Sequence, residues 1–147
     1  MYLDSGIFVK LLVREADSEF YGRLTDGQPV ASSMLAYTEV WAALAAKERK
    51  QHITPELRQQ AWCRFEQLHL EDIFDLASIS DAIVRRATWI IGRAHPQVPL
   101  RSLDAIHLAT ADQLQDWPLV TADARMHAAA LNMGYPVTDL PSSLSPI

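Results

Sequence analysis

Four acidic side chains, each in a different stretch of the chain, have the chemistry needed to hold divalent cations: Asp4, Glu39, Asp104 and Asp123. Carboxylates that share one cleft repel each other, and some of their pKa values rise unless cations neutralise them. Oxygen ligands at that density suit Mg²⁺ or Mn²⁺. Metal-assisted chemistry at such a cluster requires a fold that brings these distant residues together.

Asp104 lies in the stretch LRSLDAIHLATADQ, residues 100–113, which predicts a helix. Ser102 is expected to be the N-cap, which puts Asp104 in the first turn, where the helix dipole favours an anion. The next side chains on the same face are mostly apolar, namely His107, Leu108 and Ala111. Asp104 therefore borders a buried face, where an unpaired carboxylate is costly. Taken alone, it is also explained as a charge that complements the dipole.

Glu39 is the polar member of an otherwise apolar stripe on a helix expected from Ser33 to about Lys50. The other members of the stripe are Leu35, Ala42 and Ala46. A boundary glutamate with a buried stem and a hydrated tip gives the same pattern, so Glu39 becomes a candidate only through its neighbours in space. His107 faces the Asp104 side of its own helix and is expected to be a hydrogen-bonded core or supporting residue.

Short apolar segments alternate with amphipathic segments along the whole chain. Strands are expected at residues 1–4, 29–32, 73–77, 119–121 and 136–138. Helices are expected between them, with Thr54 and Ser80 as N-caps of two helices that run to about residues 70 and 94. This alternation predicts an α/β fold with a short, mainly parallel central sheet flanked by helices.

The carboxyl ends of parallel strands are where ligands bind in open α/β sheets. Asp4 directly follows the first strand and Asp123 follows the strand Leu-Val-Thr. The two carboxylates would meet if these strands, the first and the fourth, are neighbours. Helices begin at the same edge because each follows a strand, which brings Asp104 and Glu39 within reach of the same cleft.

Length and composition indicate one globular domain. The chain has 147 residues, of which 49% are hydrophobic and 21% charged, which is enough for a full hydrophobic core. We expect a single domain over residues 1–140 and a short, loose tail over residues 141–147. The net charge of −5 argues against a protein that coats nucleic acid, but it is compatible with a nuclease whose cations offset much of that charge.

The sequence lacks the residue patterns that several other chemistries require. The phosphate-binding patterns GxGxxG and GxxxxGK are absent, and the histidines have no zinc spacing. The single Cys63 allows no intrachain disulfide and is expected to be a buried hydrophobe. The opening residues do not form a secretory signal, and no apolar run reaches the roughly 20 residues that span a bilayer. We therefore expect no membrane association and a reduced, cytoplasmic setting.

Four stretches together resemble the PIN-domain family, and within it the VapC-type toxins of bacterial toxin–antitoxin pairs. They are YLDSGIFVKLL (2–12), SSMLAYTEVWAAL (32–44), LRSLDAIHLATA (100–111) and LVTADARMHAAALNMGYPV (119–137). The third stretch is the most specific, and the four occur in the family's order over nearly the whole chain. Residues 52–95 carry little motif. The resemblance implies a PIN-like three-layer α/β/α fold.

Carried over to this sequence, the resemblance implies a catalytic acidic site of Asp4, Glu39, Asp104 and Asp123 that holds Mg²⁺ or Mn²⁺. Ser5 and Thr121 match hydroxyl positions that support the site. Arg101 matches no family position firmly and is a candidate for phosphate contact. The implied activity is metal-dependent endoribonuclease activity on RNA phosphodiester bonds. Basic residues that are candidates for steering RNA are Lys10, Arg14, Arg85, Arg86 and Arg101.

The resemblance also implies partners: a cognate VapB-like antitoxin and a second copy of the chain in a homodimer. The antitoxin is expected to lie across an apolar groove of the early helices, with Phe8, Leu11, Leu12 and Phe20 as candidates to line it. Those side chains are equally compatible with an ordinary core.

Two other functions stay open. A catalytically inert PIN-like binding module has the same fold, although the presence of all four acids argues against a decayed site. A Mg²⁺-dependent phosphoacceptor signalling domain also uses aspartates at strand ends, but it needs a second acid beside the first aspartate and a late lysine. Position 5 is a serine, and no lysine follows Lys50.

Overall fold

The core of the fold is a sheet of four short parallel strands in the order β3–β2–β1–β4 within residues 1–141, the part of the chain that this computed structural model describes. The strands are β1 (Tyr2–Leu3), β2 (Val30–Ser33), β3 (Phe74–Ala77) and β4 (Leu119–Val120). β1 pairs with β4 through Tyr2–Leu119 and Leu3–Val120. The first and fourth strands are therefore neighbours, which is the condition under which Asp4 and Asp123 were expected to meet.

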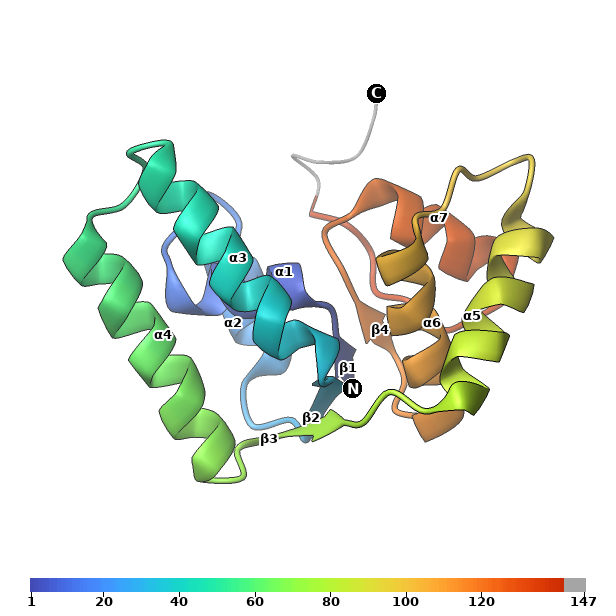
Figure 1. The fold of residues 1–147 in the computed structure, drawn as a ribbon, viewed down its shortest axis with the longest axis horizontal. Helices are drawn as coiled ribbons and strands as arrows, with labels where there is room; N and C mark the ends of the chain where they lie inside the picture. Colours follow the sequence, from blue (N-terminus) through green and yellow to red (C-terminus); the bar gives the residue numbers. More distant parts are fainter. Residues whose placement is uncertain (142–147) are drawn as a thin grey trace.

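Helices cover both faces of this sheet (Figure 1). One face carries four helices: α1 (Ser5–Leu12), α2 (Ser18–Thr25), α3 (Leu35–Arg49) and α4 (Pro55–Leu70). The other face carries α5 (Asp81–Ala94), α6 (Ser102–Leu114) and α7 (Ala124–Asn132). The expected three-layer α/β/α arrangement is confirmed. Within residues 1–141, none of the helices combines the length and apolar character that crossing a bilayer requires.

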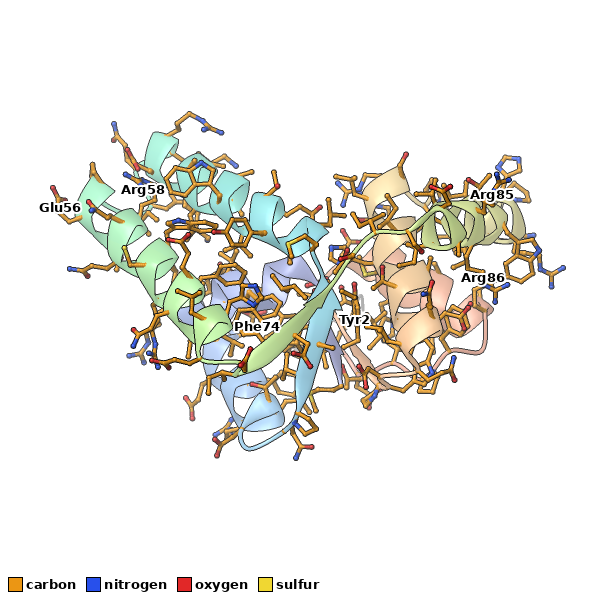
Figure 2. The ribbon with its side chains drawn as sticks, turned by 60° about the horizontal axis from the view of Figure 1, so that its bottom comes forward. Tyr2, Glu56, Arg58, Phe74, Arg85 and Arg86 are labelled. Atoms are coloured by element: carbon orange, nitrogen blue, oxygen red, sulfur yellow. The ribbon has the colours of Figure 1, made fainter. Side chains whose placement is uncertain are left out.

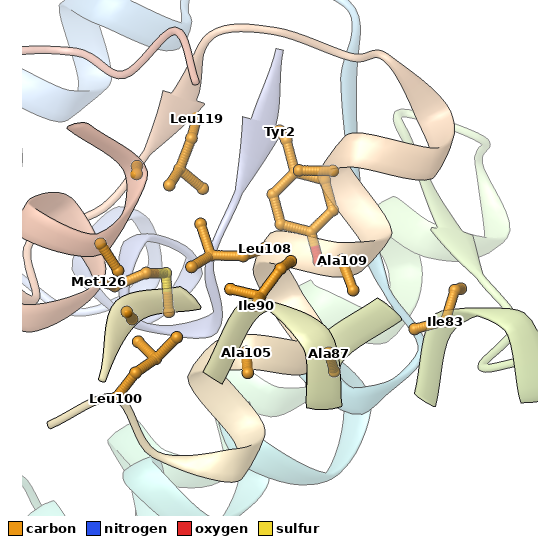
Figure 3. Close-up of a cluster of buried hydrophobic side chains, with 14 residues drawn as sticks. Tyr2, Ile83, Ala87, Ile90, Leu100, Ala105, Leu108, Ala109, Leu119 and Met126 are labelled. Carbon is orange, nitrogen blue, oxygen red and sulfur yellow. The ribbon is translucent and has the colours of Figure 1, made fainter. Parts of the chain in front are cut away.

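Two hydrophobic clusters, one on each side of the sheet, hold the layers together. Successive strand residues point to opposite faces, so β1 contributes Tyr2 to one cluster and Leu3 to the other. Tyr2 and Phe74 accordingly lie in different halves of the molecule (Figure 2). In the cluster formed with α5, α6 and α7, Tyr2 and Leu119 face the helical side chains Ile90, Leu108 and Met126 (Figure 3).

Two of the expected helix starts agree with the structure, but α3 begins at Leu35 and not at Ser33, because Ser33 is the last residue of β2. The Thr54 hydroxyl accepts a hydrogen bond from the Leu57 N–H at 3.2 Å, and the Ser80 hydroxyl accepts one from Ile83 at 3.3 Å. The prediction for α6 was wrong by one residue, because its N-cap is Arg101 and Ser102 is the first helical residue. The cap of α6 makes no side-chain hydrogen bond, so its helix start depends on tertiary packing and on Arg101.

Two smaller expectations were also wrong. Residues 136–138 form only a single bridge, Val137 to Leu119, because β4 is itself just two residues long. Cys63 is exposed, since it lies on the outer side of α4 while the neighbouring Phe65 is buried. Of the expected tail, Pro141 is buried, and residues 142–147 lie outside the described part of the chain.

Candidate active site

Asp4 is placed by the abrupt change from strand to helix at the centre of the sheet. Its backbone N–H donates to the Val120 carbonyl of β4 at 3.1 Å, and its Oδ1 caps α1 by accepting from the Ile7 N–H at 3.0 Å. Its Oδ2 accepts from the Thr121 hydroxyl. The side chain is buried, and burial raises the pKa of Asp4, to which the nearby charge of Asp123 adds. A nearby cation would therefore stabilise the ionised form of Asp4.

Asp123 occupies the corresponding position after β4. It is the N-cap of α7, and its Oδ1 accepts from the backbone N–H groups of Arg125 at 2.8 Å and Met126 at 3.0 Å. The Thr121 hydroxyl oxygen accepts from the Asp123 N–H at 3.0 Å while its own proton goes to Asp4. Thr121 thus ties the two strand-end carboxylates to each other, in agreement with its expected supporting position.

Glu39 reaches the same place from α3. Its Oε2 accepts from the Ser5 hydroxyl and lies 2.7 Å from His107 Nε2. The other ring nitrogen of His107, Nδ1, lies 2.7 Å from the hydroxyl of Tyr2. Burial alone would raise the pKa of Glu39, but the hydrogen bonds from His107 and Ser5 outweigh it and lower the pKa. Glu39 is therefore held as a carboxylate.

Asp104 lies in the first turn of α6, as expected, and is buried. Its charge is met by Arg101, whose Nε donates to Asp104 Oδ2 at 2.9 Å. The Nη2 of the same guanidinium donates to Asp123 Oδ2 at 3.0 Å. Arg101 thus bridges a carboxylate on α6 and a carboxylate that follows β4.

All four acids line one cleft of about 640 Å³ between the two helical layers. Ser5, Arg101 and His107 also line it. Gly6 forms part of the wall, and a side chain at that position would press on Asp4, since a Cβ there would lie 3.3 Å from Asp4 Oδ1. Each acid comes from a different element, so the fold brings together residues that are up to 119 positions apart in the printed sequence.

The sequence matches the PIN domain family over residues 1–131. The chain belongs to the PIN-domain family. Ribonuclease VapC49 of Mycobacterium tuberculosis is 37% identical over 151 residues, which cover 99% of this PIN domain chain and 98% of that protein.

Solved structures share this fold. The M. tuberculosis toxin VapC20, described as cleaving the sarcin–ricin loop, superposes with a TM-score of 0.68 at 17% identity over 87% of this chain and 93% of its own. A chain of a toxin–antitoxin complex from Klebsiella pneumoniae superposes with a TM-score of 0.60 at 19% identity, covering 99% and 98% of the two chains. These structures support the PIN-like architecture.

The donor set of this PIN domain suits a hard divalent cation, because carboxylate oxygens from four elements line one cleft. Their present side-chain positions do not yet form a complete site: within residues 1–141, no three His, Cys, Asp or Glu side chains are grouped closely enough to hold a metal ion. The guanidinium of Arg101 lies between two of the carboxylates. A cation held by Asp104 and Asp123 together would need that space.

Two contributions to the site were not foreseen. Tyr2 supports His107 from β1, but an apolar strand residue at position 2 gives no sign of this contact, which depends on how α6 crosses the sheet. Arg101 was a candidate for phosphate contact, and its pair with Asp104 was not expected. Its position three residues before Asp104, on one face of a helix start, is a signal that could have indicated the pair.

Proposed function

We propose that this PIN domain is a metal-dependent endoribonuclease of the VapC type, which hydrolyses phosphodiester bonds in RNA. The observation that carries the proposal is the convergence of Asp4, Glu39, Asp104 and Asp123 on one cleft. The activity of relatives such as Ribonuclease VapC49, stated in its name, supports the same function. The same proposal places the protein in the cytoplasm, together with its RNA substrates.

In this proposal Asp4, Asp104 and Asp123 hold one Mg²⁺ or Mn²⁺, and Glu39 holds a second ion or its water. The chemistry that such ions supply is activation of water and stabilisation of the leaving oxygen of a phosphodiester. The protein contributes the positions of the carboxylates. Thr121 and the N-terminus of α1 orient Asp4, and the N-terminus of α7 orients Asp123.

The hydrogen-bond partners of Glu39 contact only one of its two carboxylate oxygens. Ser5 and His107 both contact Oε2, which leaves Oε1 for the cleft. The lowered pKa of Glu39, in which these hydrogen bonds outweigh burial, keeps the side chain ionised at neutral pH. Ser5 and His107 are thus positioning residues that act through Glu39.

The proposed substrate is RNA that is single-stranded or looped, because its backbone is then accessible to the buried carboxylates of the cleft. Basic side chains are distributed unevenly around the molecule: Arg85 and Arg86 lie on α5, and Arg58 lies far away on α4 (Figure 2). Lys10 lines the cleft but is paired with Glu15 and Asp17, each at 2.8 Å. Arg101 is therefore the cation best placed at the cleft itself.

The proposed protein partner is a VapB-like antitoxin. An apolar groove of about 460 Å³ runs between α1, α2 and α4, and Phe8, Leu11 and Leu12 line it. Phe20 does not line this groove but packs against the adjacent cluster. The occurrence of the fold in a toxin–antitoxin complex supports a partner of this class. The resemblance further implies a homodimer, which sedimentation velocity would test.

The decisive experiment incubates the purified protein with RNA in Mg²⁺ or Mn²⁺, and in EDTA. Asp104→Asn should reduce cleavage by more than about 100-fold, because a buried ligand of the cleft is lost. Asp112→Asn is the matched control: it lies on the same helix but pairs with Arg86 at 2.7 Å, outside the cleft, and should cleave like the parent.

Cleavage that persists in EDTA and in the Asp104 variant would contradict the proposal. RNA binding without cleavage under every condition would favour the inert binding module instead.

A further inference from the structure

Arg101 contacts two of the four acids that line the cleft. Its Nε lies 2.9 Å from Asp104 Oδ2, and its Nη2 lies 3.5 Å from Asp104 Oδ1 and 3.0 Å from Asp123 Oδ2. Both oxygens of Asp104 therefore face this one guanidinium. The positive charge also lowers the pKa of Glu39, after the larger effects of burial and of the hydrogen bonds from His107 and Ser5.

The other carboxylate oxygens of Asp4 and Asp123 accept hydrogen bonds within the protein. Asp123 Oδ1 accepts from two backbone N–H groups of α7, and the oxygens of Asp4 accept from Ile7 and Thr121. Asp104 and Asp123 both line the cleft, and each contacts Arg101 through its Oδ2. An ion bound to both carboxylates would lie between them, in the space that the guanidinium fills.

The backbone of Arg101 is fixed, whereas its side chain is largely exposed. Its carbonyl accepts from the Ala105 N–H at 3.0 Å, which fixes the backbone as the N-cap of α6. The side chain is 57% exposed, whereas the side chain of Asp104 is 11% exposed. Asp104 is held in the cleft by its burial, whereas the exposed arginine can rotate into water when another cation neutralises the carboxylates.

We propose that Arg101 is a built-in counter-cation of the acidic cleft, which competes with the divalent ion for Asp104 and Asp123. A guanidinium stays charged at every pH at which the protein functions, so it neutralises the carboxylates when no ion is bound. Ion binding then requires Arg101 to leave. This inference rests on the proposed metal-dependent function, because without a divalent ion there is no competitor.

The competition predicts a change in metal affinity that can be measured without RNA. Mn²⁺ is titrated by calorimetry into the metal-free, full-length parent and into Arg101→Ala. The variant should bind Mn²⁺ about 10-fold more tightly, a typical size for coupling between two binding events. Arg101→Lys should be intermediate, because an ammonium keeps the charge but cannot bridge two carboxylates as a fork does. Unchanged or weaker binding to Arg101→Ala would overturn the proposal.

Arg125→Ala is the matched control for the general effect of removing a positive charge. Arg125 Nη2 lies 4.0 Å from Asp123 Oδ2 and makes no side-chain hydrogen bond to it. Its removal should tighten Mn²⁺ binding much less than removal of Arg101. An equal gain in both variants would mean that net charge alone is responsible and would overturn the proposal.

Melting temperatures separate competition from a purely structural salt bridge. In EDTA, Arg101→Ala should melt below the parent because its carboxylates are left unneutralised, and saturating Mn²⁺ should remove that difference. A deficit of equal size with and without Mn²⁺ would identify a structural bridge. If Arg101→Ala does not fold, Arg101→Gln serves both measurements, since it is neutral and closer in size.

The movement itself has a spectroscopic signature. In the parent, the Arg101 Nε–H resonance, assigned by its absence from Arg101→Gln, should shift toward that of a solvated arginine as Mg²⁺ saturates the cleft. A resonance that stays unchanged at saturation would overturn the proposal.

RNA cleavage by the parent reports on the proposed function separately. A parent that cleaves RNA with Mn²⁺, together with an Arg101 variant of unchanged affinity, leaves the function standing and removes the competition.

Discussion

Glu39 is held in place by hydrogen bonds that begin at a buried tyrosine on another element. The Tyr2 hydroxyl contacts His107 Nδ1, and His107 Nε2 contacts Glu39, both at 2.7 Å. A neutral imidazole with its proton on Nε2 satisfies both contacts, with the phenol donating to Nδ1. Burial raises the pKa of Tyr2, so the phenol keeps its proton. The position of one carboxylate thus depends on a strand residue that does not line the cleft.

Removal of the Tyr2 hydroxyl should be costly because it leaves a buried imidazole nitrogen without a partner. We expect Tyr2→Phe to lower the free energy of unfolding by about 1–2 kcal/mol in urea denaturation. If the protein is the proposed nuclease, its kcat should also fall, since the effect acts through the position of Glu39.

Tyr135→Phe is the control for this change. The Tyr135 hydroxyl accepts from Arg86 at 3.1 Å in a half-buried position, where water can replace the bond. Its loss should cost less than about 0.5 kcal/mol. Equal costs for the two variants would argue against a special role for the buried contact.

Glu15 is a second residue whose environment has a measurable consequence. It pairs with Lys10 at 2.8 Å and Lys47 at 2.7 Å and is 27% exposed. Burial alone would raise its pKa, but the hydrogen bonds and charges of the two lysines outweigh burial and lower the pKa of Glu15. A carboxyl whose pKa is lower in the folded state stabilises the protein above its unfolded pKa, and this contribution is lost as the pH falls through the folded pKa.

Glu15→Gln should therefore be less stable than the parent at neutral pH, by on the order of 1 kcal/mol. The difference should shrink as the pH is lowered through the acidic range, because the parent loses its contribution as Glu15 protonates. Urea denaturation at a series of pH values measures this. Glu19→Gln should show no such difference, since its pair with Arg23 is 77% and 74% exposed. A pH-independent deficit in Glu15→Gln would point to packing instead.

The meeting of Asp4 and Asp123 could be foreseen on the condition that the strands before them are neighbours, and the pairing of β1 with β4 meets that condition. The rule that helices begin where strands end does not apply to Asp104, because α6 follows α5 and not a strand. The partner of Asp104 could not be foreseen in the same way. Long, exposed side chains such as Arg101 have many rotamers, and local sequence does not indicate which carboxylate each will contact.

At the scale of elements, the helices differ in how their first turns are satisfied. α5 begins with a serine hydroxyl on the Ile83 N–H at 3.3 Å, which is the contact that a capping serine is expected to make. α6 has a serine at almost the same place, but Ser102 is already helical and makes no cap contact. A serine near the helix start therefore caps α5 with its side chain but does not cap α6.

These two serines give a matched pair of substitutions. Ser80→Ala should lower the free energy of unfolding by about 1 kcal/mol, because an N–H of the first turn loses its acceptor. Ser102→Ala should be neutral or slightly stabilising, since alanine suits a first-turn position. Chemical denaturation of both variants checks this. A loss in Ser102→Ala that matches the loss in Ser80→Ala would restore Ser102 as the cap.

Helices were predicted more closely than the last strand for a physical reason. The bounds of α5 follow from a capping serine, an amphipathic repeat and the His-Pro sequence after Ala94, and all of these are local. Residues 136–138 have strand composition, but a strand needs a partner of matching length, and β4 offers only Leu119 for pairing. Pairing partners are set by the tertiary fold, which local sequence does not specify.

In the molecule as a whole, a sheet of short strands separates two hydrophobic clusters. One cluster contains Ile90 and Leu108, and the other contains Leu44 and Phe65. β1 and β4, which have two residues each, contribute side chains to both clusters. We therefore propose that residues 1–140 form one cooperative domain, even though most of the chain lies in one helical half or the other.

The distribution of tryptophans allows this proposal to be tested. Trp41 and Trp62 lie on α3 and α4, whereas Trp89 lies on α5 and Trp117 just before β4. A Trp89→Phe/Trp117→Phe variant reports on one half by fluorescence, and a Trp41→Phe/Trp62→Phe variant reports on the other.

If the domain is cooperative, the fluorescence and circular dichroism transitions of each variant should coincide in urea. Far-UV circular dichroism, which reports on both halves, serves as the internal control within each variant. A fluorescence transition that clearly precedes the circular dichroism transition would indicate that one half unfolds separately.

The sequence limits the possible arrangements of the strands, but it does not indicate which side chains of each strand face which helical layer. Alternating strands and helices predict a parallel sheet with right-handed crossovers, which leaves few arrangements. Which residue of a two-residue strand faces which layer depends on register, and the sequence pair Tyr2–Leu3 is apolar at both positions. The pairing of Tyr2 with Ala31 on one side and Leu119 on the other fixes it.

The brevity of β1 makes the opening of this chain intolerant of insertions and deletions. A single residue gained or lost between Tyr2 and Asp4 would exchange the layers that Tyr2 and Leu3 enter, because side chains alternate along a strand. The same slip would turn the Asp4 carboxylate away from Thr121. Variation in length among homologous chains should therefore collect in surface connections, such as residues 95–97, which are exposed, and avoid these first positions.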